Sequence, residues 1–155
     1  MEDESTFNKV IELLAGRDIR VTEHEAVRTS EEAAQIRGTT LDSGAKAMLL
    51  TNGPALFLAV MSASRKLDSK IFKKLTSSKS LRFATEQEVF QTTKCIPGAV
   101  PPFGSIFGVK TYMDESLRTQ GDSINFNAGL RTKSVTMRLD DFITVENPVI
   151  SVFSK

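Results

Sequence analysis

Two apolar segments joined by a turn signal constrain this chain more than any other feature. Residues 45–50 (AKAMLL) and 55–61 (ALFLAVM) flank a TNGP sequence at 51–54. Asn-Gly between apolar runs is typical of a tight hairpin, because the central residues of such a turn adopt positive φ angles. The sequence therefore predicts two paired, largely buried strands. Neither run approaches the about 20 apolar residues that a membrane-spanning helix needs.

Short helices are predicted on both sides of this hairpin. Apolar side chains at 7, 10, 11 and 14 recur with helical spacing, and Gly16 follows where a helix ends. Thr29 and Thr85 each open a Thr-x-x-Glu capping box, which predicts a helix start. Leucine and isoleucine recur every four residues over 67–75, and two aspartates at 140–141 indicate the first turn of a C-terminal helix.

Further strands are predicted at 19–24, 105–109, 124–128 and 134–139 from short apolar or alternating runs. Strands and helices do not alternate in the regular order that builds a doubly wound parallel sheet. We therefore expect an α+β fold, with a mixed, barrel-like β-sheet and short helices packed outside it. No repeat or low-complexity linker divides the chain, so residues 1–155 are expected to form a single domain.

The composition excludes several classes of protein. Hydrophobic residues make up 40% of the chain and charged residues 25%, as in ordinary soluble proteins. Acidic residues follow Met1, which is the wrong charge for a secretory or mitochondrial leader. One cysteine, Cys95, excludes an intramolecular disulfide, and one histidine, His24, leaves too few ligands for structural zinc. We expect a cytoplasmic protein with no metal, no cofactor and no membrane contact.

Charge is concentrated locally although the net charge is only +1. Residues 65–82 contain seven basic residues and one acidic residue, whereas residues 1–34 contain nine acidic residues and four basic ones. A concentrated basic segment can follow a phosphate backbone even on a nearly neutral protein. A solvated helix face whose lysines contact nothing is the alternative.

An apolar loop at 95–104 (CIPGAVPPFG) contains three prolines and two glycines, which exclude regular structure. Gly98 to Pro102 is a Gly-x-x-x-Pro segment: glycine permits close approach of a ligand, and the prolines fix the directions of the peptide groups. Such a loop can hold a small amino-acid group and donate N–H groups to an oxyanion. The alternative is a rigid corner that closes the sheet.

Three other features suggest chemistry. Lys46 enters a very apolar strand, where it must pair, extend to solvent or bind an anion. The segment INFNAG ends a strand with Asn127 as a polar group and Gly129 as a point of close approach. Cys95 and His24 are the only residues able to form a thiol–imidazole pair. The alternatives are an outward-facing lysine, a simple turn and a buried filler cysteine.

Taken in order, these segments resemble the YbaK and prolyl-tRNA synthetase editing-domain family of aminoacyl-tRNA deacylases. The resemblance covers roughly residues 20–145. Its matching pieces are Thr22-Glu23-His24 with TSEEAAQIRG, the lysine of SGAKAMLL, the loop PGAVPPFG, and INFNAG followed by KSVTMRLDDFI.

The resemblance implies hydrolysis of the ester between a wrong small amino acid (Ala, Cys, Ser or Thr) and the 3′ adenosine of a tRNA, with tRNA-Pro as the expected carrier. It implies catalysis without a metal or cofactor, by a water that the Gly98–Pro102 loop orients with help from the tRNA 2′-hydroxyl. Lys46 and Gly98 would take the catalytic positions. Substrate contacts would come from His24, Ala99, Val100, Pro101, Pro102, Asn127 and Gly129.

No synthetase is appended to the resembling segment, so editing would act in trans, and an aminoacyl-tRNA synthetase is a second expected partner. The loop begins Gly-Ala instead of the family's Gly-Gly, which leaves the amino acid open. The alternative function is a non-catalytic module that binds tRNA or docks onto a synthetase complex. The acidic residues 2–4 and the apolar tail 149–153 would serve docking or homodimerisation. A Cys95-dependent hydrolase is a third possibility.

Overall fold

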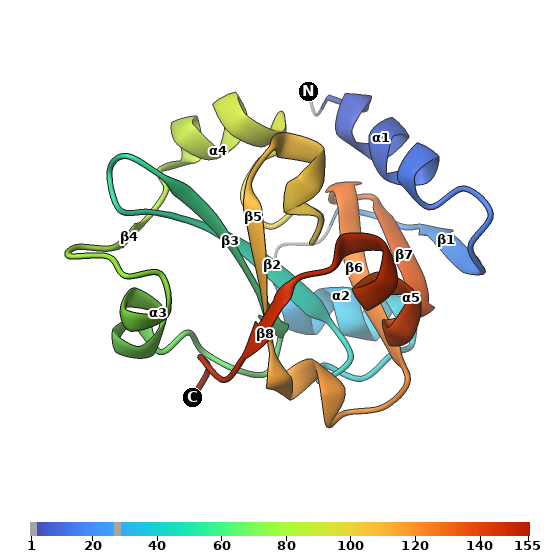
Figure 1. Cartoon of the computed structure of the whole chain (residues 1–155). Coiled ribbons are helices and arrows are strands. Elements are labelled where there is room, and N and C mark those ends of the chain that lie inside the picture. The colour runs from blue at the N-terminus through green and yellow to red at the C-terminus, as the bar shows by residue number, and fades with distance from the viewer. Residues whose placement is uncertain (1–2, 27–28) are drawn as a thin grey trace.

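The predicted hairpin lies at the centre of the larger of two sheets in the computed structural model, which describes residues 3–26 and 29–155 (Figure 1). The five strands of this sheet, in spatial order, are β4 (Arg82–Phe83), β2 (Ala45–Thr51), β3 (Leu56–Ser62), β5 (Lys110–Asp114) and β8 (Val149–Ser151). β2 pairs antiparallel with β3 and β4, whereas β5 runs parallel to both β3 and β8. The sheet is therefore mixed, as predicted.

The smaller sheet is antiparallel and has three strands in the order β1 (Ile19–Glu23), β7 (Lys133–Arg138) and β6 (Ser123–Leu130). A parallel bridge between Gly44 and Asn125 brings its edge to the start of β2. The Asn125 backbone N–H donates to the Ser43 carbonyl at 2.9 Å. The described strands do not close into a barrel, but this bridge gives a barrel-like arrangement. The predicted α+β class is confirmed.

Five short helices surround the sheets (Figure 1). They are α1 (Ser5–Leu13), α2 (Ser30–Arg37), α3 (Ser69–Leu75), α4 (Glu86–Thr93) and α5 (Leu139–Glu146), with 3-10 turns η1 (Gly104–Phe107) and η2 (Glu115–Arg118). The capping box of Thr85 and Glu88 is present, and the Thr29 hydroxyl accepts from the Glu32 N–H at 3.1 Å. No helix of the described residues is long and apolar enough to cross a bilayer.

The apolar side chains form two clusters on opposite faces of the larger sheet. Ala45, Ala47 and Leu49 of β2 contribute to the cluster shared with the smaller sheet. Met48 and Leu50 contribute to the other, which α3 covers with the ring of Phe72. This alternation is the period of a strand buried on both faces.

The apolar tail predicted for docking or dimerisation is used within the fold. Val149–Ser151 forms β8, and Phe153 is fully buried with its ring centroid 5.0 Å from that of Phe72. Val152 of the same segment is exposed and β8 is an edge strand, so the homodimer remains a prediction.

The predicted strand at 105–109 is wrong. Gly104–Phe107 forms the 3-10 turn η1, and the strand begins only at Lys110. Gly104 packs where a side chain would not fit, since a Cβ there would lie 2.3 Å from the Val109 carbonyl oxygen. Gly108 then ends the turn in the left-handed region, with φ +70°. Close packing at Gly104 and the left-handed conformation of Gly108 therefore override the apolar pattern between them.

Candidate active site

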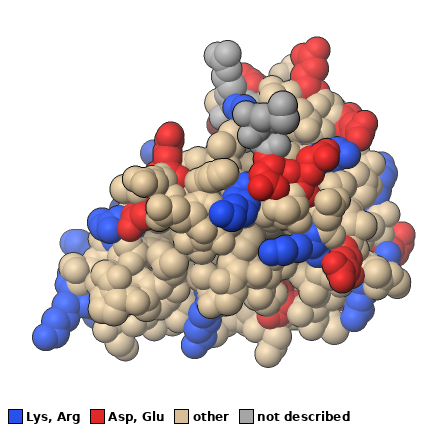
Figure 2. Space-filling view, turned by 90° about the horizontal axis from the view of Figure 1, so that it is seen from above, with Lys and Arg blue, Asp and Glu red and all other residues tan. Residues whose placement is uncertain are grey.

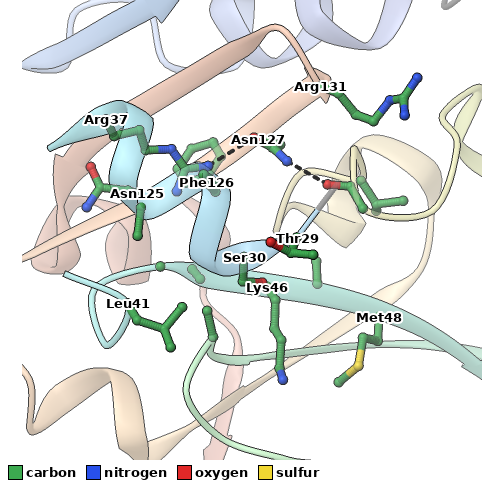
Figure 3. A pocket seen from close by; sticks show the side chains of 18 of the residues that line it. Thr29, Ser30, Arg37, Leu41, Lys46, Met48, Asn125, Phe126, Asn127 and Arg131 are labelled. Atoms are coloured by element: carbon green, nitrogen blue, oxygen red, sulfur yellow. Dashed lines mark hydrogen bonds between the residues drawn. The ribbon is translucent and has the colours of Figure 1, made fainter. Parts of the chain in front are cut away.

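A cavity of about 360 Å³ opens where the two sheets diverge, between α2, the first half of β2, the loop before Pro101, and β6 (Figure 3). Its polar lining consists of Thr29, Ser30, Arg37, Lys46, Asn125, Asn127 and Arg131. Three of these side chains are cationic, and no carboxylate is among the described residues that line the cavity. The site therefore favours an anionic or electron-rich ligand.

One wall of the cavity is an open strand edge. On this side the described part of β2 has neighbours only near its two ends: the bridge between Gly44 and Asn125 lies at its start, and at its end the Leu49 carbonyl accepts from the Ala84 N–H at 2.9 Å. Peptide groups alternate in direction along an antiparallel strand. The N–H and C=O of Ala47, two residues earlier, therefore point toward the same open side. They offer a donor and an acceptor to a ligand.

The proline-rich loop forms the opposite wall. Gly98 lines the cavity with φ +91°, a conformation that favours glycine. Its carbonyl accepts from the Asn127 amide at 2.8 Å, and the Ala99 carbonyl accepts from the Gly129 N–H at 2.8 Å. These two bonds fix the loop to β6, so the cavity wall is held by strand and loop together.

Arg37 lies in the last turn of α2, where the helix dipole favours a cation. Its Nη2 donates to the Asn127 Oδ1 at 2.9 Å, and its Nε donates to the Ser134 hydroxyl at 2.8 Å. Both acceptors are neutral. Burial lowers the pKa of Arg37 to about 10. Arg37 forms no ion pair with any residue in the ranges 3–26 and 29–155.

His24 lies behind this pair and does not line the cavity. Its Nε2 is 2.7 Å from the Ser134 hydroxyl, and its Nδ1 is 2.8 Å from the Glu25 carbonyl oxygen. Ser134 thus joins the imidazole to the guanidinium of Arg37. His24 reaches the cavity only through this shared hydroxyl, so its position is that of a supporting residue.

Lys46 lies on the rim, with its ammonium pointing away from Arg37 and Asn127 (Figure 3). The Nζ donates to the Arg65 carbonyl oxygen. Burial lowers the pKa of Lys46, and nearby Lys66 lowers it further, while Glu31 opposes both. The side chain of Lys46 therefore points away from the strand, as the outward-facing alternative predicts, but its ammonium remains partly desolvated.

A family model described as an aminoacyl-tRNA editing domain matches residues 24–145. The chain belongs to this family. A relative from Escherichia coli K12, the multifunctional Ser/Thr-tRNA deacylase ProXp-y, is 34% identical over 97% of this chain and 93% of its own length. The same protein of Escherichia coli O157:H7 matches equally well. The predicted reaction class, hydrolysis of aminoacyl-tRNA esters, is confirmed at the level of the family.

Solved structures show that the editing-domain fold extends over almost the whole chain. A candidate trans-editing enzyme for prolyl-tRNA synthetase superposes with a TM-score of 0.86 at 23% identity, covering 97% of this chain and 98% of its own. A scaffold protein used for epitope grafting superposes with a TM-score of 0.87 at 20% identity, covering 99% of both chains. At these identities the likeness concerns the fold alone.

The editing domain brings together only part of the predicted site. Lys46, Gly98, Val100 and Asn127 line the cavity. The other predicted contacts, which lie behind the lining, are His24, Ala99, Pro101, Pro102 and Gly129. The glycine serves packing instead, because a Cβ at Gly129 would lie 2.8 Å from the Phe7 backbone nitrogen.

Several polar residues of the site were not predicted: Thr29, Ser30, Arg37, Asn125 and Arg131 of the lining, and Ser134 behind it. Arg37 falls within the matching segment TSEEAAQIRG, but a basic residue in the last turn of a helix has an ordinary explanation in the dipole. Cys95 is buried in the core and does not line the cavity. Among the described residues, no group of three His, Cys, Asp or Glu side chains is placed to hold a metal ion.

Proposed function

We propose that this editing domain acts in trans in the cytoplasm, as a single domain over residues 1–155, and removes a wrongly attached small amino acid from tRNA. Serine and threonine are the first candidates, because the relative at 34% identity is named for them. Alanine and cysteine remain in the same size class. The observation that carries the proposal is the cavity itself, with three cationic side chains and no carboxylate among its described lining.

The size of the cavity supports selection of small side chains. At about 360 Å³ it lies near the lower limit of small-molecule sites, which span roughly 300–1,000 Å³. A rigid wall rejects a large side chain more effectively than it separates near-isosteres. Val100 contributes apolar surface to this wall, and the fixed Gly98 carbonyl keeps it in place. The largest side chains would be excluded, while several small ones would be accepted.

The chemistry proposed is attack of water on the ester carbonyl, which breaks the bond to the ribose oxygen and yields a free amino acid and a 3′-hydroxyl. The Gly98–Pro102 loop would orient the water, and the ribose 2′-hydroxyl would assist proton transfer to the leaving oxygen. Peptide N–H groups of the loop and of Ala47 are suited to bind the carbonyl oxygen as it gains charge. Positioning and oriented dipoles then account for the rate, with Lys46 at the nucleotide end.

The α3 region supplies the surface we propose for the tRNA backbone. Five exposed lysines lie on α3 or beside it: Lys66, Lys70, Lys73, Lys74 and Lys79. Within the described chain, none of them forms an ion pair. The face seen from above, where α1 and α4 lie, instead carries interspersed acidic and basic side chains (Figure 2). Lys66 follows Arg65, whose carbonyl accepts from the Lys46 Nζ, so the basic surface starts beside the cavity rim.

The test is deacylation of a panel of tRNAs. We would charge tRNA-Pro with Ala, Cys, Ser, Thr or Pro, and charge tRNA-Ala with Ser so that the carrier and the amino acid vary independently. Wild type, Lys46→Ala and the matched surface control Lys9→Ala would be compared. Selective release of serine or threonine, lost in Lys46→Ala and retained in Lys9→Ala, is the expected result.

Other outcomes have distinct meanings. Release of serine from both tRNAs would support the amino acid and remove tRNA-Pro as the required carrier. Binding of tRNA without any release would favour the non-catalytic module, and co-purification with a synthetase would identify its docking partner. Sedimentation of the same samples would test the predicted homodimer.

A further inference from the structure

Arg37 is a cation that the fold holds rigidly but does not neutralise. A guanidinium carries five N–H donors, and two are used, one on Asn127 and one on Ser134. The other three have no hydrogen-bond partner within the part of the chain that the structure describes. The side chain lines the cavity and is only half-buried. Unused donors on a partly desolvated charge that faces a cavity are available to a ligand.

The two bonds that Arg37 does make prepare it for a ligand. Asn127 is itself fixed by its bond to the Gly98 carbonyl, and Ser134 is fixed by the His24 imidazole. The guanidinium plane is therefore oriented before any ligand arrives. The pKa of about 10 leaves it charged at neutral pH. A planar fork of this kind matches the oxygens of a phosphate or carboxylate.

The groups of an aminoacyl-tRNA end narrow the choice of ligand. The α-amino group of the ester is a cation and would be repelled by Arg37, while the ribose and the adenine are neutral. The only full negative charge near the ester is the phosphate on the 5′-oxygen of the terminal adenosine. Arg131, a second cation of the lining, adds to the attraction for this group.

We propose that Arg37 forms a phosphate subsite that binds the 5′-phosphate of the terminal adenosine and so positions the ester against the Gly98 loop. This inference rests on the proposed function and assigns Arg37 as a positioning residue. Its contribution would be to binding and alignment, because the phosphate takes no part in the bond that breaks.

Binding is measured first, since it needs no turnover. The probes are adenosine, adenosine 5′-methyl phosphate, which carries a single charge as in tRNA, and inorganic phosphate. Titration calorimetry would compare wild type, Arg37→Gln and the exposed control Arg118→Gln. We expect wild type and the control to bind the phosphorylated nucleoside about 10- to 100-fold more tightly than adenosine, and Arg37→Gln to lose this preference. Equal binding of both nucleosides by wild type would overturn the proposal, as would inorganic phosphate binding as tightly as the nucleotide.

Turnover gives the second readout. The substrates are the 3′-O-seryl esters of the same two nucleosides, with seryl-tRNA as the reference. Arg37→Gln should lower kcat/KM by about 10- to 100-fold on the phosphorylated ester and leave the plain adenosine ester unchanged. An equal loss on both esters would instead indicate that Arg37 acts on the reacting carbonyl or merely supports the loop. Failure of wild type to release serine, threonine, alanine or cysteine from tRNA would overturn the deacylase proposal, whereas the binding result would still decide the subsite.

Discussion

Asp114 and Arg37 are both at least partly buried charges without an ion pair among the described residues, and they are held in opposite ways. Both Asp114 oxygens are occupied: Oδ1 accepts from the N–H groups of Phe153 and Ser154, and Oδ2 accepts from the Ser154 hydroxyl and the Ser116 N–H. Arg37 uses only two of its donors and faces a cavity. Asp114 has hydrogen-bond partners on both oxygens, which suits a role in stability. Arg37 has unused donors, which suits the role in ligand binding that we propose for it.

This difference has a structural cause. Asp114 ends β5 beside the last residues of the chain, so its carboxylate fastens the C-terminal segment to the larger sheet. Arg37 ends α2 where the two sheets diverge, and no further element covers it. A charged group with all its hydrogen-bond partners in the protein stabilises the fold, while one with unused donors can bind a ligand.

The largest effect is expected for Asp114→Asn. Its amide NH₂ would face groups that are themselves donors, and we expect the free energy of unfolding to fall by about 3 kcal/mol. Urea denaturation measures this loss, with the exposed Asp122→Asn as the control within about 0.5 kcal/mol. Turnover by the folded fraction should be unchanged, and a selective loss of kcat would contradict the structural role.

The pH dependence of this effect has a defined sign. Burial alone would raise the pKa of Asp114, but the hydrogen bonds from Phe153, Ser116 and Ser154 outweigh it and lower the pKa below 3.8. A carboxylate with a lowered pKa stabilises the fold above its unfolded value and loses that contribution as the pH falls. The difference between wild type and Asp114→Asn should therefore narrow below pH 3.8.

Asn127→Asp would give Arg37 an ion-pair partner within the protein. Like Asp114, Arg37 would then have its charge stabilised without a ligand. The new carboxylate would neutralise the guanidinium and face the Gly98 carbonyl without a donor. We expect kcat/KM on aminoacyl-tRNA to fall by about 100-fold, through repulsion of phosphate and displacement of the loop. Asn8→Asp on α1 adds the same charge at an exposed position and should retain activity. Full activity of Asn127→Asp would show that the unpaired charge is not needed.

The lysines of the basic surface beside α3 differ from both Asp114 and Arg37, because they are exposed and form no ion pair among the described residues. Replacing Lys70, Lys73 and Lys74 by Gln should raise KM for aminoacyl-tRNA about 10-fold and lessen the slope of log KM against log salt by about 2 to 3. The kcat should not change. A triple replacement of Lys9, Lys110 and Arg118 controls for total charge, and an equal effect there would remove the specific role of α3.

Much of the fold was predictable because its signals are local. The hairpin of β2 and β3 and the capping box of Thr85 follow from a few neighbouring residues. β4 and β8 were missed because they have only two and three residues, and they are strands through their partners alone. The turn at Gly104 was missed for a related reason, since its cause is contact with Val109 and Thr111.

The site was less predictable because it depends on contacts between distant segments. The loop from Gly98 has its own proline signature, but Ser134 gains its role only by lying between His24 and Arg37. Those two residues are 110 and 97 positions away from it in the sequence. No local sequence pattern predicts contacts between residues so far apart in the chain.

The smallest effect is expected for the stability of Arg37→Gln. Removal of a partly desolvated charge offsets the loss of two hydrogen bonds to neutral acceptors, so the free energy of unfolding should change by less than about 1 kcal/mol at pH 7. Because burial lowers the pKa of Arg37 to about 10, the unfolded chain holds the proton more tightly, and wild-type stability should rise relative to Arg37→Gln as the pH passes above 10. Urea denaturation at pH 7 and near pH 10.5 measures both values. A loss near that of Asp114→Asn would place Arg37 among the charges that close the fold, and its unused donors would then have no functional meaning.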